Sequence, residues 1–150
     1  MISVYLPFSG AQYNFDLLKE LKNNKLIKKI FLLTQNSQIE IPNSCEVLSV
    51  ENLTSFKTID SILKSDDSNY VLLFTQDSHY ELGQFAIERF YNVINSTQAA
   101  MVYSNYFAVN ENSIVRHPVN DYQLGSLRDD FDFGSLLFIN RNYCQSFLSE

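Results

Sequence analysis

Short apolar runs alternate with segments of helical periodicity along the chain as far as residue 104. The apolar runs predict buried strands, and apolar residues repeating every three or four positions predict amphipathic helices. We expect strands at residues 2–6, 27–33, 45–50, 70–74 and 100–103, and helices at 13–24, 54–64 and 82–94, with Asn14 as the N-cap of the first helix. This alternation favours an α/β fold with a mostly parallel central sheet and flanking helices.

The last third of the chain has a different pattern. The apolar residues at 107–109 and 114–115 flank Asn110-Glu111-Asn112-Ser113, which predicts a hairpin. Residues 117–134 are irregular and rich in Asp, Gly and aromatic side chains. A final strand is expected at 135–139, with Asn140 capping a helix that begins at Arg141. Because the chain stops inside that helix, we expect residues 1–150 to be a single domain, truncated at its C-terminal end.

Composition and charge narrow the class of protein. The chain is 45% hydrophobic and 19% charged, as expected for a globular domain, and its net charge of -6 disfavours a nucleic-acid partner. No apolar run approaches the ~20 residues of a membrane span, and no cleavable signal precedes the first strand. Cys45 and Cys144 are expected to be reduced thiols in the core. We therefore expect a cytoplasmic protein, with any peripheral membrane contact made by residues beyond Glu150; the sequence does not set the oligomeric state.

Several common sites are absent from the sequence. It contains no G-x-G-x-x-G dinucleotide motif, no phosphate-binding P-loop and no G-x-S-x-G nucleophile elbow. The two histidines, His79 and His117, do not have metal-ligand spacing to another ligand. These absences disfavour a Rossmann dehydrogenase, a P-loop NTPase, an α/β-hydrolase and a zinc enzyme.

The polar residues that follow the predicted strands are the candidate site. The strand at 70–74 runs directly into Thr75-Gln76-Asp77-Ser78. Ligands of open α/β sheets bind beyond the carboxyl ends of the strands, so Asp77 is expected at such a site. Phe8 and Ser9 follow the first strand in the same way and could contact a base or ribose; packing in the core is the alternative for Phe8.

In the order and spacing of these elements the chain resembles the family 2 glycosyltransferases, whose nucleotide-binding half has the GT-A fold. The resemblance rests on Val4-Tyr5-Leu6-Pro7 before the first helix, on Ile30-Phe31-Leu32-Leu33-Thr34-Gln35-Asn36-Ser37, and on Leu73-Phe74-Thr75-Gln76-Asp77 in the place of the D-x-D motif. Residues 100–105 and 134–141 resemble later strands of the family. The resemblance implies a GT-A-like three-layer sandwich, a nucleotide-sugar donor, a glycan or glycoconjugate acceptor and a divalent cation, Mg²⁺ or Mn²⁺.

The resemblance also implies roles for individual residues. Asp77 would be the metal ligand, although Thr75 occupies the first position of the D-x-D motif. Gln35 stands where the family has an acidic residue, and its amide can still bond a base edge. The general base would lie beyond Glu150. The residues expected to bind the nucleotide are Pro7, Phe8, Ser9, Gln35, Ser37 and Lys57.

A second acidic cluster is formed by Asp129, Asp130 and Asp132 in the irregular segment. Asp130 and Asp132 are expected on the acceptor side of the site, and a solvated acidic turn with aromatic anchors is the alternative. The sequence thus predicts a domain that transfers a sugar from a nucleotide sugar to a polysaccharide or glycoconjugate. The alternative is a catalytically inactive GT-A-like binding module, which the lost acidic residues favour.

Overall fold

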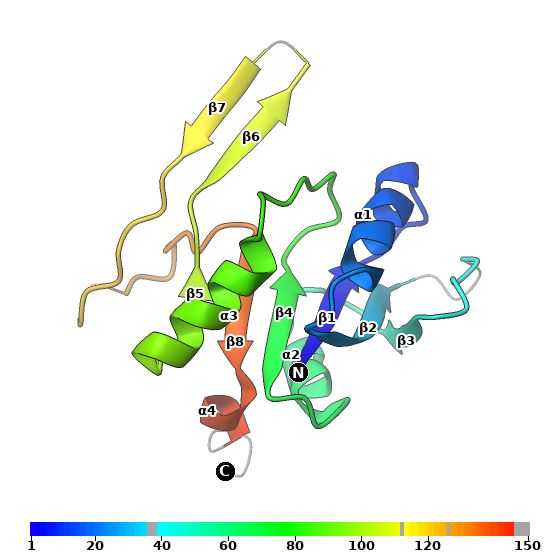
Figure 1. Cartoon of the computed structure of the whole chain (residues 1–150), viewed down its shortest axis with the longest axis horizontal. Coiled ribbons are helices and arrows are strands. Elements are labelled where there is room, and N and C mark those ends of the chain that lie inside the picture. Colours follow the sequence, from blue (N-terminus) through cyan, green and yellow to red (C-terminus); the bar gives the residue numbers. More distant parts are fainter. Residues whose placement is uncertain (36–38, 112, 126, 146–150) are drawn as a thin grey trace.

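A six-stranded sheet forms the centre of the molecule, and a separate two-stranded hairpin projects from it (Figure 1). The computed structural model describes residues 1–35, 39–111, 113–125 and 127–145. The strands are β1 (Ile2–Pro7), β2 (Ile27–Thr34), β3 (Glu46–Ser49), β4 (Tyr70–Phe74), β5 (Met101–Tyr103), β6 (Tyr106–Asn110), β7 (Ser113–His117) and β8 (Leu136–Asn140). The helices are α1 (Gln12–Lys22), α2 (Phe56–Lys64), α3 (Ala86–Thr97) and α4 (Arg141–Gln145).

The sheet is mostly parallel, as the sequence predicts. Its order is β3-β2-β1-β4-β8-β5, and β6 and β7 form the hairpin. The strands from β3 to β4 are all parallel, whereas β8 is antiparallel to both β4 and β5. The late strand β8 therefore separates two strands that a simple alternation of strand and helix would have made neighbours.

Both faces of the sheet are covered, which produces three layers. All six residues of β1 are buried, as expected for a central parallel strand. On one face Val4 and Leu6 belong to the core cluster that contains residues of α1 and α3, and on the other face Tyr5 belongs to a cluster that contains Ile62 of α2. Among the described residues, no helix is long and apolar enough to cross a membrane.

The helices predicted to begin at residues 13, 54 and 82 begin instead at Gln12, Phe56 and Ala86, and the N-cap assigned to Asn14 is wrong. Helix α1 begins at Gln12 with Ala11 at the cap position, so Asn14 lies inside its first turn. Its side chain is fully buried and bonds residues outside the helix, a tertiary role that local capping rules do not reveal. Helix α3 begins at Ala86 because Phe85 before it adopts a left-handed conformation with φ 56°.

The predicted thiols are free in the structure. Cys45 and Cys144 are both partly buried and neither is in a disulfide. Burial raises the pKa of each thiol above its ordinary value. Both side chains therefore favour the protonated, unreactive form.

A buried ion pair joins the first residue of α4 to the segment before β4. The Arg141 guanidinium donates to Asp66 Oδ1 at 2.7 Å, and the two side chains are only 1% and 3% exposed. Burial raises the pKa of Asp66, but hydrogen bonds from Ser3 and Ser68 and the charge of Arg141 outweigh that effect and place the pKa below its ordinary value.

We expect this ion pair to make the free energy of unfolding depend on pH in the acid range. A carboxylate whose pKa is lowered by folding stabilises the folded state above its unfolded pKa, and this contribution is lost as the pH falls through the folded value. The free energy of unfolding should therefore drop as the pH falls below the ordinary Asp66 pKa of 3.8. Urea unfolding at a series of pH values measures this drop, and Asp66→Asn should flatten the curve in that range. An unchanged slope in the variant would rule out Asp66 as the source.

Candidate functional site

The strand order creates a switch point between β1 and β4. From β1 the chain first builds β2 and β3 on one side, and later returns to place β4 on the other side. Open α/β sheets bind their ligands in the crevice at such a point, outside the carboxyl ends of the strands. The loops that carry Gln35 and Asp77 follow β2 and β4, which flank β1, so they lie at the same edge of the sheet, about 10 Å apart in strand spacing.

A hydrogen-bonded cluster occupies this switch point. Asp77 Oδ1 accepts a hydrogen bond from Asn14 Nδ2 at 3.1 Å and one from the Tyr13 hydroxyl at 3.2 Å. The other end of the Asn14 amide, Oδ1, accepts from the backbone N–H and the hydroxyl of Ser9, each at 3.3 Å. We call Ser9, Tyr13, Asn14 and Asp77 the switch-point cluster. It joins the end of β1, the start of α1 and the loop after β4.

Burial within the cluster is graded in a way that suits a binding site. Asn14 is fully buried, whereas Asp77 is exposed. The chain reverses between Ser9 and α1 at Gly10, whose φ of 81° is a conformation that favours glycine. The exposed Asp77 carboxylate is thus held by the buried Asn14 amide, which would lose its hydrogen bonds to Ser9 and Asp77 if it moved into solvent.

The loop after β4 is anchored to the start of β8. The backbone N–H of Thr75 donates to the Ser135 carbonyl at 3.1 Å. The Tyr80 hydroxyl lies 3.2 Å from the Gln76 carbonyl and 3.3 Å from that of Ser135, and its ring packs on Phe74. Burial raises the pKa of Tyr80 to about 12, so its hydroxyl remains a hydrogen-bond donor. These contacts hold the segment that presents Asp77.

Comparison with known proteins identifies the fold and not the family. No family model matches the sequence, and no curated protein matches it. Among solved structures, the chain is similar to a 2-C-methyl-D-erythritol 4-phosphate cytidylyltransferase of Francisella tularensis. The TM-score is 0.58 at 15% sequence identity, over 99% of this chain and 76% of that chain. The chain has a GT-A-like fold. This confirms the predicted fold class, whereas membership of family 2 stays a prediction.

The predicted nucleotide-binding residues of this GT-A-like domain lie in different surroundings. Ser9 belongs to the switch-point cluster. Pro7 and Phe8 are buried, and the Phe8 ring packs edge-to-face on Phe15 in the core, the alternative considered for it. Gln35 is exposed and donates from Nε2 to the Glu51 carbonyl at 2.8 Å.

The other two predicted residues, Lys57 and Ser37, are not placed at the switch-point cluster by the described structure. Lys57 is exposed in the first turn of α2, on the face of the sheet opposite α1. Ser37 lies outside the described residues. For all six residues a role in binding a nucleotide stays a prediction.

The predicted acceptor-side residues lie in an exposed turn. Asp130 pairs with Arg128 at 2.8 Å, and Asp132 Oδ1 accepts from the Gly134 N–H at 2.7 Å. The aromatic residues between and after them, Phe131 and Phe133, pack on Tyr103 of β5. This arrangement matches the alternative of a solvated acidic turn with aromatic anchors, and contact with an acceptor stays a prediction.

Asp77 is a single carboxylate. Among the described residues, no group of three His, Cys, Asp or Glu side chains is placed to hold a metal ion. Mg²⁺ is often bound by only one or two carboxylates together with substrate phosphates. Asp77 therefore fits a cation that is shared with a phosphate-bearing substrate, but not a cation site made by the protein alone.

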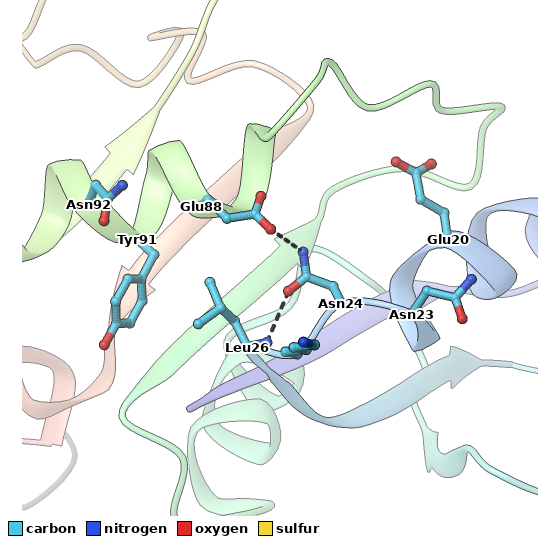
Figure 2. Close-up of a pocket in the computed structure, with 8 residues that line it drawn as sticks. Glu20, Asn23, Asn24, Leu26, Glu88, Tyr91 and Asn92 are labelled. Atoms are coloured by element: carbon cyan, nitrogen blue, oxygen red, sulfur yellow. Dashed lines mark hydrogen bonds between the residues drawn. The ribbon is translucent and has the colours of Figure 1, made fainter.

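Two surface hollows lie away from the switch point. One, of about 630 Å³, lies between the end of α1 and the side of α3, and Figure 2 shows Asn24 in it bonded to Glu88 at 2.9 Å and to the Leu26 N–H at 3.0 Å. The other, of about 420 Å³, is lined by the end of α3 and by residues near β5, such as Met101 and Asp121. Neither hollow is lined by a member of the switch-point cluster.

Sequence reasoning missed two residues of the cluster, Tyr13 and Asn14. The available signal was positional, because the helix that follows the first strand of an open α/β sheet begins at the switch point. An Asn and a Tyr in the first turn of that helix are polar groups next to the expected ligand site. Local propensity instead favoured a capping role for Asn14.

Proposed function

We propose that this GT-A-like domain binds a nucleotide sugar at the carboxyl edge of β1 and β4 and transfers the sugar to a glycan or glycoconjugate. The observation that carries the proposal is the exposed Asp77 carboxylate, held at the switch point by buried Asn14. The element order and the resemblance to family 2 glycosyltransferases support the sugar-transfer chemistry. The similarity to a cytidylyltransferase supports a ligand that contains a nucleotide.

Electrostatics makes a cation necessary for this ligand. The chain carries a net charge of -6, and Asp77 adds a negative charge at the point where a diphosphate would lie. Direct contact between the carboxylate and the diphosphate would be repulsive. A bound Mg²⁺ or Mn²⁺ would act as a Lewis acid that stabilises the charge on the leaving diphosphate. Binding should therefore depend on a divalent cation.

In this proposal the residues of the switch-point cluster orient the Asp77 carboxylate and offer hydrogen-bond donors to the ligand. Tyr13 and Asn14 both donate to Asp77 Oδ1, so they restrain the carboxylate, which would leave Oδ2 available to a cation. Ser9 offers a hydroxyl beside the buried amide. Gln35, at the end of the neighbouring strand, would bond the edge of the base through its amide.

The second candidate is a catalytically inactive binding module with the same ligand. Thr75 in place of the first acidic residue, and a single carboxylate in place of two, favour it. One carboxylate holds a cation more weakly than two, so the transition state would gain less stabilisation. Slow or absent breakdown of a bound nucleotide sugar would favour this candidate over the transferase.

Calorimetric titration with UDP, UDP-sugars and CTP, with and without Mn²⁺, tests the proposal. We expect binding only in the presence of the cation, and a loss of at least about tenfold in affinity for Asp77→Asn, equivalent to about 1.4 kcal/mol. The matched control is Asp67→Asn, because Asp67 is an exposed carboxylate before β4, at the opposite end of that strand, where it pairs with Lys28. Failure of every nucleotide to bind, or equal affinity in the Asp77 and Asp67 variants, would contradict the proposal.

A further inference from the structure

The segment that connects β5 to β8 is exposed or only partly buried at every residue that the structure describes. Within residues 104–111, 113–125 and 127–134, no described residue is buried. Seven of the 14 large hydrophobic side chains that are exposed in the described chain lie in this segment: Phe107, Val109, Ile114, Val115, Tyr122, Leu124 and Leu127. Such a concentration of exposed apolar surface is typical of an interaction site.

The hairpin of β6 and β7 presents part of this surface on one face. It projects away from the six-stranded sheet (Figure 1). Its register pairs Phe107 with Arg116 and Val109 with Ile114, and directly paired residues point to the same side of a ribbon. We call these four residues the hairpin face. Phe107, Val109 and Ile114 are 64%, 72% and 71% exposed.

A ribbon with this face in water lacks most of the stabilisation that folding requires. An isolated two-stranded hairpin is marginally stable at best, and it needs a third strand or a packed surface against its apolar side. The other side of the ribbon has some support, because the ring of Tyr106 stacks on that of His117 at 5.0 Å. The hairpin face has no such cover within the described chain, so a partner is expected there.

Charge favours a second copy of this chain as the partner. The whole chain is acidic, but residues 106–117 contain one acidic and one basic residue, Glu111 and Arg116, and are neutral overall. Two copies can approach at this hairpin without the repulsion that the rest of the surface would impose. Arg116 lies near the base of the hairpin, in register with Phe107, and Glu111 lies at its tip, after Asn110.

A two-fold axis that lies between two facing hairpins, perpendicular to their length, would make these charges meet. An axis in this direction places the base of one hairpin over the tip of the other, and every contact then occurs twice. Arg116 of each copy would approach Glu111 of the second copy, and the three apolar side chains would pack across the axis. The hairpin face and Glu111 at the tip of the hairpin would together be complementary to a second copy in both charge and apolarity.

We propose that the hairpin face is the contact surface of a homodimer of this chain. Three apolar side chains contribute on the order of 100 Å² each, below the ~800 Å² per partner of a typical specific interface. We expect Tyr122, Leu124 and Leu127, which follow the hairpin in the uncovered segment, to add to the contact. The dimer should accordingly depend on protein concentration. This proposal is independent of the proposed function.

Sedimentation equilibrium of the full chain over a range of concentrations tests the proposal. We expect the mass to rise with concentration from 17.4 kDa toward twice that value. Val109→Lys should keep the chain monomeric, because two like charges would be buried at the axis. Val93→Lys is the matched control: Val93 lies on α3 and is 43% exposed, and this variant should dimerise like the parent.

Charge exchange supplies a second test that does not depend on how well Val109→Lys folds. Glu111→Arg and Arg116→Glu should each weaken the dimer about tenfold, and the combined variant should regain most of the loss. Circular dichroism checks that each variant is folded. A parent that stays monomeric at every concentration, a dimer unaffected by Val109→Lys in a folded chain, or single and combined charge variants that dimerise equally would each overturn the proposal.

Discussion

Replacing Arg141 by Met should lower the free energy of unfolding by about 3–5 kcal/mol, the usual effect of removing one partner of a buried ion pair. The guanidinium bonds Asp66, the Tyr5 hydroxyl at 3.0 Å and the Ser68 carbonyl at 2.8 Å, and further carbonyls at the end of α2. Met fills much of the same volume but satisfies none of these groups. Asp66 would then be a buried charge without its cation, and urea unfolding measures the loss.

A matched pair on the surface provides the control. Arg128 donates to Asp130 at 2.8 Å, almost the same distance as in the buried pair, but its side chain is 78% exposed. Arg128→Met should cost no more than about 1 kcal/mol, because water solvates the remaining carboxylate. Adding Asp66→Asn to Arg141→Met should recover part of the stability by removing the stranded charge. Equal losses for the two Arg variants would contradict the buried ion pair.

Replacing Phe138 by Ala should also cost about 3–5 kcal/mol, the usual range for deleting a buried aromatic side chain. Phe138 is fully buried in the middle of β8. Its ring stacks on Tyr70 at 5.4 Å and on Phe90 at 6.0 Å, so it joins the sheet to α3. The loss of the ring would leave a cavity between these two neighbours, and thermal or urea unfolding would report it.

The control for this prediction is an exposed ring of the same kind. Phe56 at the start of α2 is 75% exposed, and Phe56→Ala should change the stability by less than about 0.5 kcal/mol. This comparison also tests the position of β8, because Phe138 is buried where β8 lies between β4 and β5. A Phe138 variant as stable as the Phe56 variant would show that β8 does not belong to the core.

The sequence predicted the elements well because most of them are buried on a regular period. The strands at 70–74 and 27–33 are apolar runs in the sequence, and they are central in the sheet. The hairpin was predicted at 107–115 by its turn residues and is present as β6 and β7. Helix α3 was predicted to begin at residue 82, but it begins at Ala86, because the left-handed conformation of Phe85 is not encoded in apolar spacing.

The candidate site was only partly predictable. Asp77 and Ser9 could be found because they follow strands whose carboxyl ends share one edge. The partner of Asp77 could not be read from spacing, because Asn14 bonds a residue 63 positions away. Arg141 was expected only as the first residue of a helix, and its pairing with Asp66 likewise depends on tertiary contacts between distant segments. Side-chain pairing across the fold requires the strand order, which periodicity alone does not determine.

In the function that we propose, a nucleotide and its cation bind at the carboxyl edge of β1 and β4. The most direct measurement is the change in backbone amide NMR shifts of the ¹⁵N-labelled chain when UDP or CTP is added with Mg²⁺. We predict changes concentrated at Ser9, Asn14, Gln35 and Asp77, and their loss in Asp77→Asn. No change with either nucleotide, or changes confined to the hollow around Asn24 and Leu26, would contradict the account.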